Sequence, residues 1–200
     1  MENDLTVKKS KGGYYMQRNL GKYNVPPTLQ TLMDLEKELG DCEHFYDGLH
    51  FYLSPSDFRY FNTPSDVIVF GHIGADGIHY GFLTDYGSVA DLEEAPIVCI
   101  CPMDFEQPTR IIANNLREFL RINFTDEPLF YNDFATKDNY LAFKEEQATI
   151  YPLSERQLTN QARIKNFLEE NVQMPIIERP YWYIQTIRLQ RRVNDENMKE

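Results

Sequence analysis

The stretch Gly74–Gly77, with the sequence GADG, constrains the fold more than any other feature of the chain. It separates two runs rich in aromatic and β-branched residues, 67–72 and 78–84, and such runs are typical of β-strands. Because glycine adopts positive φ at little cost, the two runs are expected to pair as an antiparallel hairpin. A parallel crossover needs roughly a dozen residues or more and does not fit here. The sequence therefore predicts a mainly antiparallel sheet.

A helix is expected before this sheet. It follows Pro26 and Pro27 and stops at Gly40, because apolar residues recur between these points at helical spacing and glycine commonly ends helices. The apolar residues are Leu29, Leu32, Met33, Leu35 and Leu39. Two further runs, Leu49–Leu53 and Ile97–Cys101, are expected to add strands to the sheet.

A second helix is expected to open at Pro108 and Thr109. The residues that would share its apolar face are Ile112, Leu116, Phe119 and Leu120. The order of helix, strands and helix predicts an α+β fold, with a mainly antiparallel sheet flanked by helices.

The last third of the chain is expected to form a mixed helical extension packed on this core. Ser154 and Gln157 make a capping-box pattern, and a short helix is expected to begin near Asp138. The stretch Tyr181–Leu189, which contains the only tryptophan, Trp182, is expected to be a strand. The helix after Ser154 has its apolar face at Leu158, Ile164, Phe167, Leu168 and Val172. The predicted organisation is a basic segment 1–22, an α+β domain 23–125 and an extension 126–200.

Charge is distributed unevenly along the chain, whose formal net charge is −11. Residues 1–22 carry a net charge of +3, residues 23–135 carry −14, and residues 136–200 are neutral. The negative middle block would repel nucleic acid and anionic membranes and would attract a basic protein. The alternative interpretation is that the acids serve solubility alone.

The cysteines and the apolar pattern bear on location. Three cysteines cannot all pair, and Cys99 and Cys101 lie two apart in an expected strand, which is a poor geometry for a disulfide. A reducing compartment fits best. No window reaches the roughly 20 consecutive apolar residues of a membrane-spanning helix, and the first residues are too polar for an export signal. A cytoplasmic protein without membrane contact is expected.

The order of motifs from Val67 to Asn123 resembles the SUKH superfamily, which includes fungal cell-wall-synthesis regulators and bacterial immunity proteins. An apolar strand enters the Gly74–Gly77 stretch, an aromatic strand ends in Asp85, and a strand follows Pro96 before a helix that finishes in LREFL. With the proline-rich entry to the first helix, the resemblance covers roughly residues 25–123, about half of the chain. It implies an α+β fold that binds another protein, in bacteria often a nuclease toxin that the antidote neutralises.

Acidic residues are the candidates for contact with a basic partner. Asp76 is presented on the expected hairpin, although aspartate also favours turns because its side chain bonds nearby backbone N–H groups. Two acidic clusters are better candidates, with a solvated surface as the alternative. They are Asp41, Glu43 and Asp47, and Asp91, Glu93 and Glu94. Aromatic anchors nearby, unless they are core residues, are Phe45, Tyr46, Phe58, Tyr60 and Phe61.

Catalytic and metal chemistry find less support in the sequence. His72 and His79 would face each other across the expected hairpin, but zinc requires at least one more ligand. A thiol nucleophile at Cys42 would need His44 or His50 as its base, and nothing in the sequence orients them. Nucleophile-elbow, phosphate-loop and dinucleotide patterns are missing. The chain is expected to be no enzyme and to use no cofactor or metal; the main alternative is a sensor or adaptor that binds a small molecule or peptide.

Overall fold

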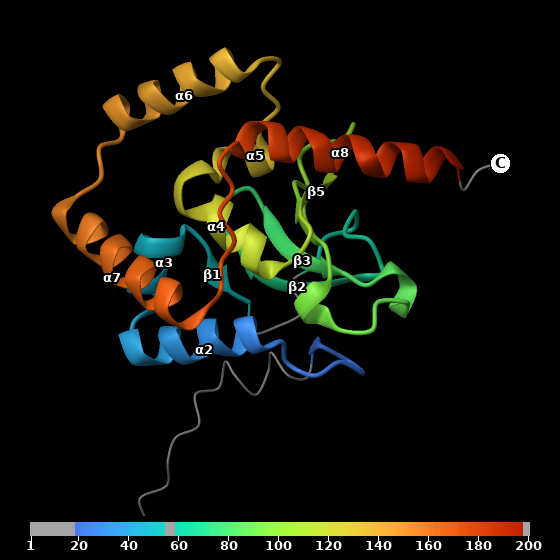
Figure 1. Ribbon diagram of the computed structural model, residues 1–200, viewed down its shortest axis with the longest axis horizontal. Helices are drawn as coiled ribbons and strands as arrows, with labels where there is room; N and C mark the ends of the chain where they lie inside the picture. The colour runs from blue at the N-terminus through green and yellow to red at the C-terminus, as the bar shows by residue number, and fades with distance from the viewer. Residues whose placement is uncertain (1–18, 55–58, 198–200) are drawn as a thin grey trace, which may run out of the picture.

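The computed structural model describes residues 19–54 and 59–197, with side chains described up to Leu189. Its centre is a five-stranded sheet in the order β1-β2-β3-β4-β5, and every neighbouring pair is antiparallel (Figure 1). The strands are β1 (Tyr52–Leu53), β2 (Val67–His72), β3 (His79–Leu83), β4 (Ile97–Ile100) and β5 (Thr109–Ala113). The α+β fold with a mainly antiparallel sheet is confirmed.

The predicted hairpin joins β2 to β3. His72 pairs with His79 in the register, and the Ile73 N–H donates to the Ile78 carbonyl at 3.1 Å to close the turn. Within the turn, Gly74 and Gly77 have positive φ, and so does Asp76, at 52°. The glycines therefore provide the backbone freedom on which the prediction rested.

Helices surround the sheet along the rest of the chain. They are α2 (Pro27–Leu39), α3 (Cys42–Leu49), α4 (Leu116–Asp126), α5 (Pro128–Tyr131), α6 (Lys137–Ile150), α7 (Glu155–Asn171) and α8 (Pro180–Asn197), with two short 3₁₀ turns, η1 (Asp85–Gly87) and η2 (Leu92–Glu94). α2 ends at Gly40 in the left-handed conformation, as predicted. The capping box of Ser154 and Gln157 begins α7 and is confirmed. None of the helices described has both the length and the apolar character needed to cross a membrane.

The expected helix from Pro108 is wrong in its first part. Thr109–Ala113 is strand β5, which pairs with β4, and α4 starts only at Leu116. β-Branched residues favour the strand, and Asn115 fixes the helix start because its side chain accepts a hydrogen bond from the Glu118 N–H at 3.0 Å.

Two other element predictions also need correction. Tyr181–Leu189 lies in helix α8, not in a strand: Tyr181, Ile184 and Ile187 are buried at a spacing of three residues, which places them on one helix face. The expected strand Leu49–Leu53 is reduced to the two residues of β1, because Leu49 still belongs to α3.

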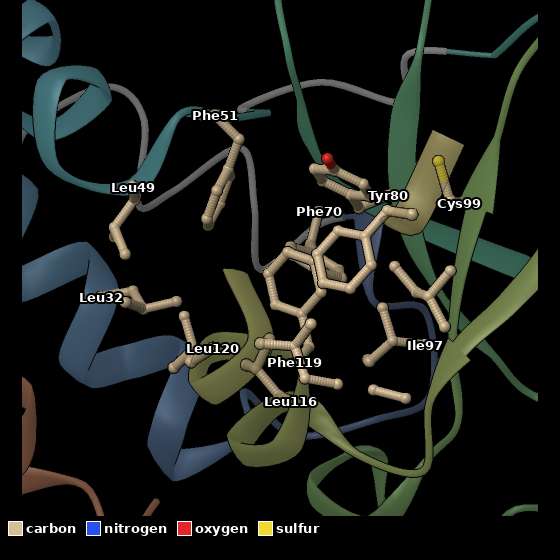
Figure 2. Close-up of a cluster of buried hydrophobic side chains, with 14 of the residues drawn as sticks. Leu32, Leu49, Phe51, Phe70, Tyr80, Ile97, Cys99, Leu116, Phe119 and Leu120 are labelled. Atoms are coloured by element: carbon tan, nitrogen blue, oxygen red, sulfur yellow. The ribbon is translucent and has the colours of Figure 1, made fainter. Parts of the chain in front are cut away.

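An aromatic cluster fills the space between the sheet and α4. The ring of Phe119 lies 5.0 Å from Tyr80, 5.5 Å from Phe51 and 5.7 Å from Phe70, all with edge-on geometry. Figure 2 shows these side chains together with Leu116 and Leu120 of α4. Residues that alternate along the strands and point to the opposite face of the sheet form a second, smaller apolar cluster. Strand β4 is therefore buried on both faces, which explains why its sequence is continuously apolar.

The C-terminal helices make unequal contacts with this core. α7 packs closely on α3, where a Cβ at Gly48 would come within 2.4 Å of the Ile164 Cδ1 atom. α8 packs on β5. In contrast, α6 stands apart from the sheet at the upper margin of Figure 1, and Tyr140 is its one buried residue.

Candidate protein-binding surface

Three loops meet at the end of the sheet that carries the β2–β3 turn. They are segment 59–64, the turn 73–78 and the β4–β5 loop 101–108. The Asn62 side-chain amide donates to the Pro102 carbonyl at 3.0 Å and so joins the first loop to the third. The Tyr60 ring stacks on His79, the first residue of β3, with centroids 5.9 Å apart. The loops therefore form one continuous surface.

Large apolar side chains project from this surface into solvent. The exposed fractions are 85% for Phe61, 76% for Phe105 and 69% for Met103. Tyr60 is also exposed, and the carboxylates of Asp76 and Glu106 lie on the same loops. Grouped exposed apolar side chains with a polar rim are typical of sites that bind another molecule. We call Tyr60, Phe61, Asp76, Met103, Phe105 and Glu106 the sheet-end surface.

Asp104 holds the β4–β5 loop in place between Met103 and Phe105. Its carboxylate accepts hydrogen bonds from the Gln107 N–H at 3.0 Å and from the Glu106 N–H at 3.1 Å, and it pairs with Arg110. The Gln107 N–H, together with the Arg110 guanidinium and the Glu106 N–H, lowers the pKa of Asp104. The loop is thus ordered by its own residues.

Arg110 connects this loop to the helical layer. It is buried, and besides Asp104 it contacts the Tyr131 carbonyl at 2.7 Å and the Asp133 carboxylate at 2.9 Å. A buried arginine with several acceptors is a strong positional constraint, because its donors have a fixed planar arrangement. Met103 and Phe105 are therefore displayed from a rigid base.

His79 anchors the other side of the surface. The Gly77 carbonyl lies 2.7 Å from Nδ1, so Nδ1 carries the proton and donates, and Nε2 accepts from the Thr63 hydroxyl at 3.0 Å. Thr63 in turn accepts from the Tyr60 N–H at 2.9 Å. Burial lowers the pKa of His79, which favours this neutral form.

The arrangement of the histidines does not suit a metal. His72 and His79 do face each other in the hairpin, as the register prediction required, but both ring nitrogens of His79 are already engaged. Over the described residues, no three histidine, cysteine or acidic side chains lie close enough to hold a metal ion.

The first acidic cluster lies at the start of α3 and along it. Asp41 caps the helix by accepting from the Glu43 N–H, and the Glu43 carboxylate accepts from the Tyr52 hydroxyl at 3.0 Å. Asp47 is buried between α3 and α7, where it contacts Arg156 and Asn160. Asp47 thus joins two helices of the chain and offers no carboxylate to a partner, contrary to the prediction.

The second acidic cluster is at η2 and is also bound internally. Asp91 caps η2, and Glu94 pairs with Arg117. The two oxygens of Glu93 accept from the backbone N–H and the hydroxyl of Thr28, in the first turn of α2. Glu93 therefore acts as a helix cap, and its assignment to a partner contact is not supported by the geometry.

The aromatic residues proposed as anchors differ in exposure. Phe45 is fully buried and belongs to the core, Tyr46 is half-buried, and Phe58 lies outside the described residues. Tyr60 and Phe61 are exposed. Of the predicted residues, Asp76, Tyr60 and Phe61 are the ones that come together on one surface.

The residues around Cys42 do not form a catalytic pair. Cys42 begins α3, and among the described residues no hydrogen bond joins its thiol to His44 or His50. The Nε2 atom of His50 lies instead 2.9 Å from the Gln161 side-chain nitrogen on α7. A thiol nucleophile needs a base within hydrogen-bond reach, and this geometry provides none.

The sequence reasoning missed Met103, Phe105 and Glu106. They follow a strand and precede residues that were expected to begin a helix. Recognising β5 as a strand would have placed them in a strand-to-strand loop, where large apolar side chains have no helix face to bury them.

No protein-family model, no curated protein and no solved structure matches the chain. The geometry of the sheet-end surface is therefore the main guide to function.

Proposed function

We propose that this chain is a non-catalytic protein-binding module whose sheet-end surface contacts a basic protein. The observation that supports this most directly is the exposure of Phe61, Met103 and Phe105 on loops that are anchored through the buried side chains of His79 and Arg110. Aromatic residues and methionine are enriched at the centres of protein interfaces, and rigid loops reduce the entropy lost on binding.

Charge indicates the class of partner. The block 23–135, which contains the whole surface, has a net charge of −14, and Asp76 and Glu106 are exposed on the same loops as the apolar side chains. A negative field speeds the encounter with a positively charged protein and disfavours acidic ones. The association rate should consequently fall as ionic strength rises.

The resemblance to the SUKH superfamily suggests the biological setting. In that setting the chain is a cytoplasmic immunity or regulatory protein, and its partner is a basic protein such as a nuclease toxin. A nuclease that grips phosphate presents a positive surface, and an acidic protein bound there blocks access of the nucleic acid. The mechanism is occlusion, without any bond made or broken by the chain.

The experiment compares partners recovered from the native host by three versions of the full chain. They are the wild type, the double variant Phe61→Asp/Phe105→Asp, and the control Ile176→Asp, whose side chain is 85% exposed but lies beside α8. The wild type and the control should recover the same basic protein, and the double variant should not. Recovery of that protein by all three, or of acidic proteins only, would contradict the proposal.

A second candidate function rests on a hollow at the start of α8. It has a volume of about 510 Å³ and is lined by Ile176, Ile177, Glu178, Arg179, Trp182, Tyr183 and Thr186. Aromatic and apolar walls with a few polar groups suit a small molecule or a short peptide. In this case the chain would be a sensor or adaptor, and a ligand that raises the melting temperature of the wild type should have no effect on Trp182→Ala.

A further inference from the structure

Two buried thiols lie in contact at the point where β4 ends. Cys99 is in the strand (Figure 2), Cys101 is the first residue after it, and their sulfurs are 3.8 Å apart. The sequence predicted one strand through Cys101, in which cysteines two positions apart are badly placed for a disulfide. Because β4 ends at Ile100, Cys101 belongs instead to the β4–β5 loop.

Two arginine side chains act on this thiol pair. Arg110 pairs with Cys99 in the register of β4 and β5 and is buried. Arg188 shares the Asp133 carboxylate with Arg110. The Nε atoms of both guanidiniums are buried and have no hydrogen-bond partner among the described residues. A cationic environment of this kind favours a thiolate over a neutral thiol.

The two thiols differ in acidity and in access. A hydrogen bond from the Cys99 thiol lowers the pKa of Cys101, and Arg110 and Arg188 act in the same direction, against burial and the Asp104 carboxylate. Burial raises the pKa of Cys99. Cys101 keeps 6% of its surface exposed, whereas Cys99 has none. Cys101 is therefore the thiol that loses its proton first and that a molecule as small as hydrogen peroxide can reach.

Cys101 is also the base of the loop that displays Met103. The Asp104 N–H donates to the Cys101 carbonyl at 3.0 Å and closes a β-turn with Pro102 and Met103 as its central residues. The Cys101 N–H donates to the Pro108 carbonyl at 2.7 Å, which joins the two ends of the loop. A shift of Cys101 is therefore passed directly to Met103.

The same shift reaches the neighbouring loop. The Pro102 carbonyl accepts the hydrogen bond from Asn62, the residue after Phe61. A disulfide bond is about 2.0 Å long, so the two sulfurs must approach by about 1.8 Å to form one. Cys99 is held between β3 and β5, so most of this movement falls on Cys101.

We propose that Cys99 and Cys101 are an oxidation site, at which hydrogen peroxide closes a disulfide that displaces the loops of the sheet-end surface. The further consequence, that oxidation releases the basic partner, rests on the proposed function. In a reducing compartment a disulfide is typically transient and serves redox sensing, and dithiol reductants reverse it.

The reaction takes place in two steps. The Cys101 thiolate attacks one oxygen of hydrogen peroxide, the O–O bond breaks, and the products are the Cys101 sulfenic acid and a hydroxide that takes up the proton released by Cys101. The Cys99 sulfur then attacks the Cys101 sulfur, and the S–O bond breaks. The hydroxyl group leaves with the Cys99 proton as water. Two thiols lose two electrons in total, and one peroxide is reduced to two waters.

The experiment uses the full chain with Cys42→Ser, which removes the exposed thiol. Peroxide should remove the mass of two hydrogen atoms at Cys99 and Cys101, as located by mass spectrometry of peptides, and dithiothreitol should restore it. With Cys99→Ala added, Cys101 should stop at the sulfenic acid, which dimedone traps. With Cys101→Ala added, Cys99 should remain a thiol. The wild type reports the oxidant dose through the trapping of its exposed Cys42.

The movement of the loop is measured by amide hydrogen exchange. The N–H groups of Cys101 and Asp104 should exchange faster after oxidation, and dithiothreitol should reverse the change. The Cys101→Ala chain is the matched control and should show no change in the Asp104 N–H. It also retains the exposed Met103, so any effect of methionine oxidation appears in the control as well and is not reversed by dithiothreitol.

Binding of the basic partner separates this inference from the proposed function. The oxidised chain should bind it at least about tenfold more weakly than the reduced chain, and reduction should restore the affinity. Thiols that stay reduced at a dose that modifies Cys42, or a disulfide that leaves exchange in residues 101–108 unchanged, would overturn the oxidation site. Equal affinity of both forms would overturn the release. Disulfide formation and faster exchange in a chain whose reduced form recovers no basic protein would support the oxidation site and refute the proposed function.

Discussion

Asp47 of α3 and Arg156 of α7 form an ion pair, with 2.9 Å between the carboxylate and the guanidinium Nε. The two side chains differ greatly in exposure, at 4% for Asp47 and 62% for Arg156. Loss of the arginine would therefore leave a buried carboxylate with fewer partners, whereas loss of the aspartate would leave a solvated arginine. Asp47, which the sequence analysis assigned to a partner-binding surface, therefore holds α7 on α3.

Removing the guanidinium should weaken this helix contact. We expect Arg156→Ala to lower the free energy of unfolding by about 1–3 kcal/mol, because the buried Asp47 then keeps Asn160 as its one side-chain partner among the described residues. Urea unfolding followed by circular dichroism measures the change. The matched control is Arg163→Ala, which breaks an exposed pair with Glu38 and should cost below about 1 kcal/mol. Equal losses in the two variants would contradict the structural role of Asp47.

The start of α4 can be tested at Asn115. Its side chain caps the helix, so Asn115→Ala should lower the free energy of unfolding by about 1 kcal/mol, whereas Asn115→Ser should restore most of that loss. Urea titration of both variants provides the values. If alanine and serine had the same effect, the helix would not begin at this position, and the reassignment of Thr109–Ala113 to a strand would be in question.

Stability should depend on pH through His79. Burial lowers the pKa of its imidazole below the ordinary value of 6.5, so below that pH the unfolded chain binds a proton that the folded chain does not. The contribution of His79 is therefore fully present above about pH 6.5 and is lost as the pH falls toward the folded-state pKa.

The comparison that isolates this effect uses His79→Asn, which retains a donor for the Gly77 carbonyl. We expect the variant to lose less free energy of unfolding than the wild type between pH 7.5 and pH 5.5. His72 has the same sign of shift, and the pKa of Glu127 is raised by burial, so the difference between proteins is the informative quantity. Parallel pH profiles would refute the neutral, buried state of His79.

The three cysteines should differ in reactivity. Cys42 is exposed, whereas Cys99 and Cys101 are buried with their sulfurs 3.8 Å apart, and burial raises the pKa of the Cys99 thiol. Iodoacetamide should modify Cys42 alone in the folded chain, as read by mass spectrometry, and all three in urea. Modification of Cys42 should leave binding of the basic partner unchanged. A loss of any activity on this modification would favour a thiol-based function.

The sequence predicted the elements whose signals are local. The hairpin followed from two glycines in a short turn, α2 from leucine spacing and Gly40, and α7 from the pairing of Ser154 with Gln157. In each case the residues that specify the element are within a few positions of one another. Local chemistry was therefore sufficient.

The wrongly predicted elements have different causes. Thr109–Ala113 contains β-branched residues that favour the strand it forms beside the neighbouring β4, so its local signal was misread. Tyr181–Leu189 is helical because α8 buries one face against β5, which is far away in the sequence. Two of the candidate site residues were misjudged because their partners are far away in the sequence. Glu93 is engaged by Thr28 and Asp47 by Arg156, over separations of 65 and 109 residues, which no local pattern reveals.

The most direct test is the affinity of the basic partner, once recovered, for the wild type and for Phe61→Ala/Phe105→Ala, with Ile176→Ala as the control. If the sheet-end surface is the contact, the double variant should bind at least about tenfold more weakly, a loss of about 1.4 kcal/mol, and the control should match the wild type. Equal affinity for all three proteins would contradict the account.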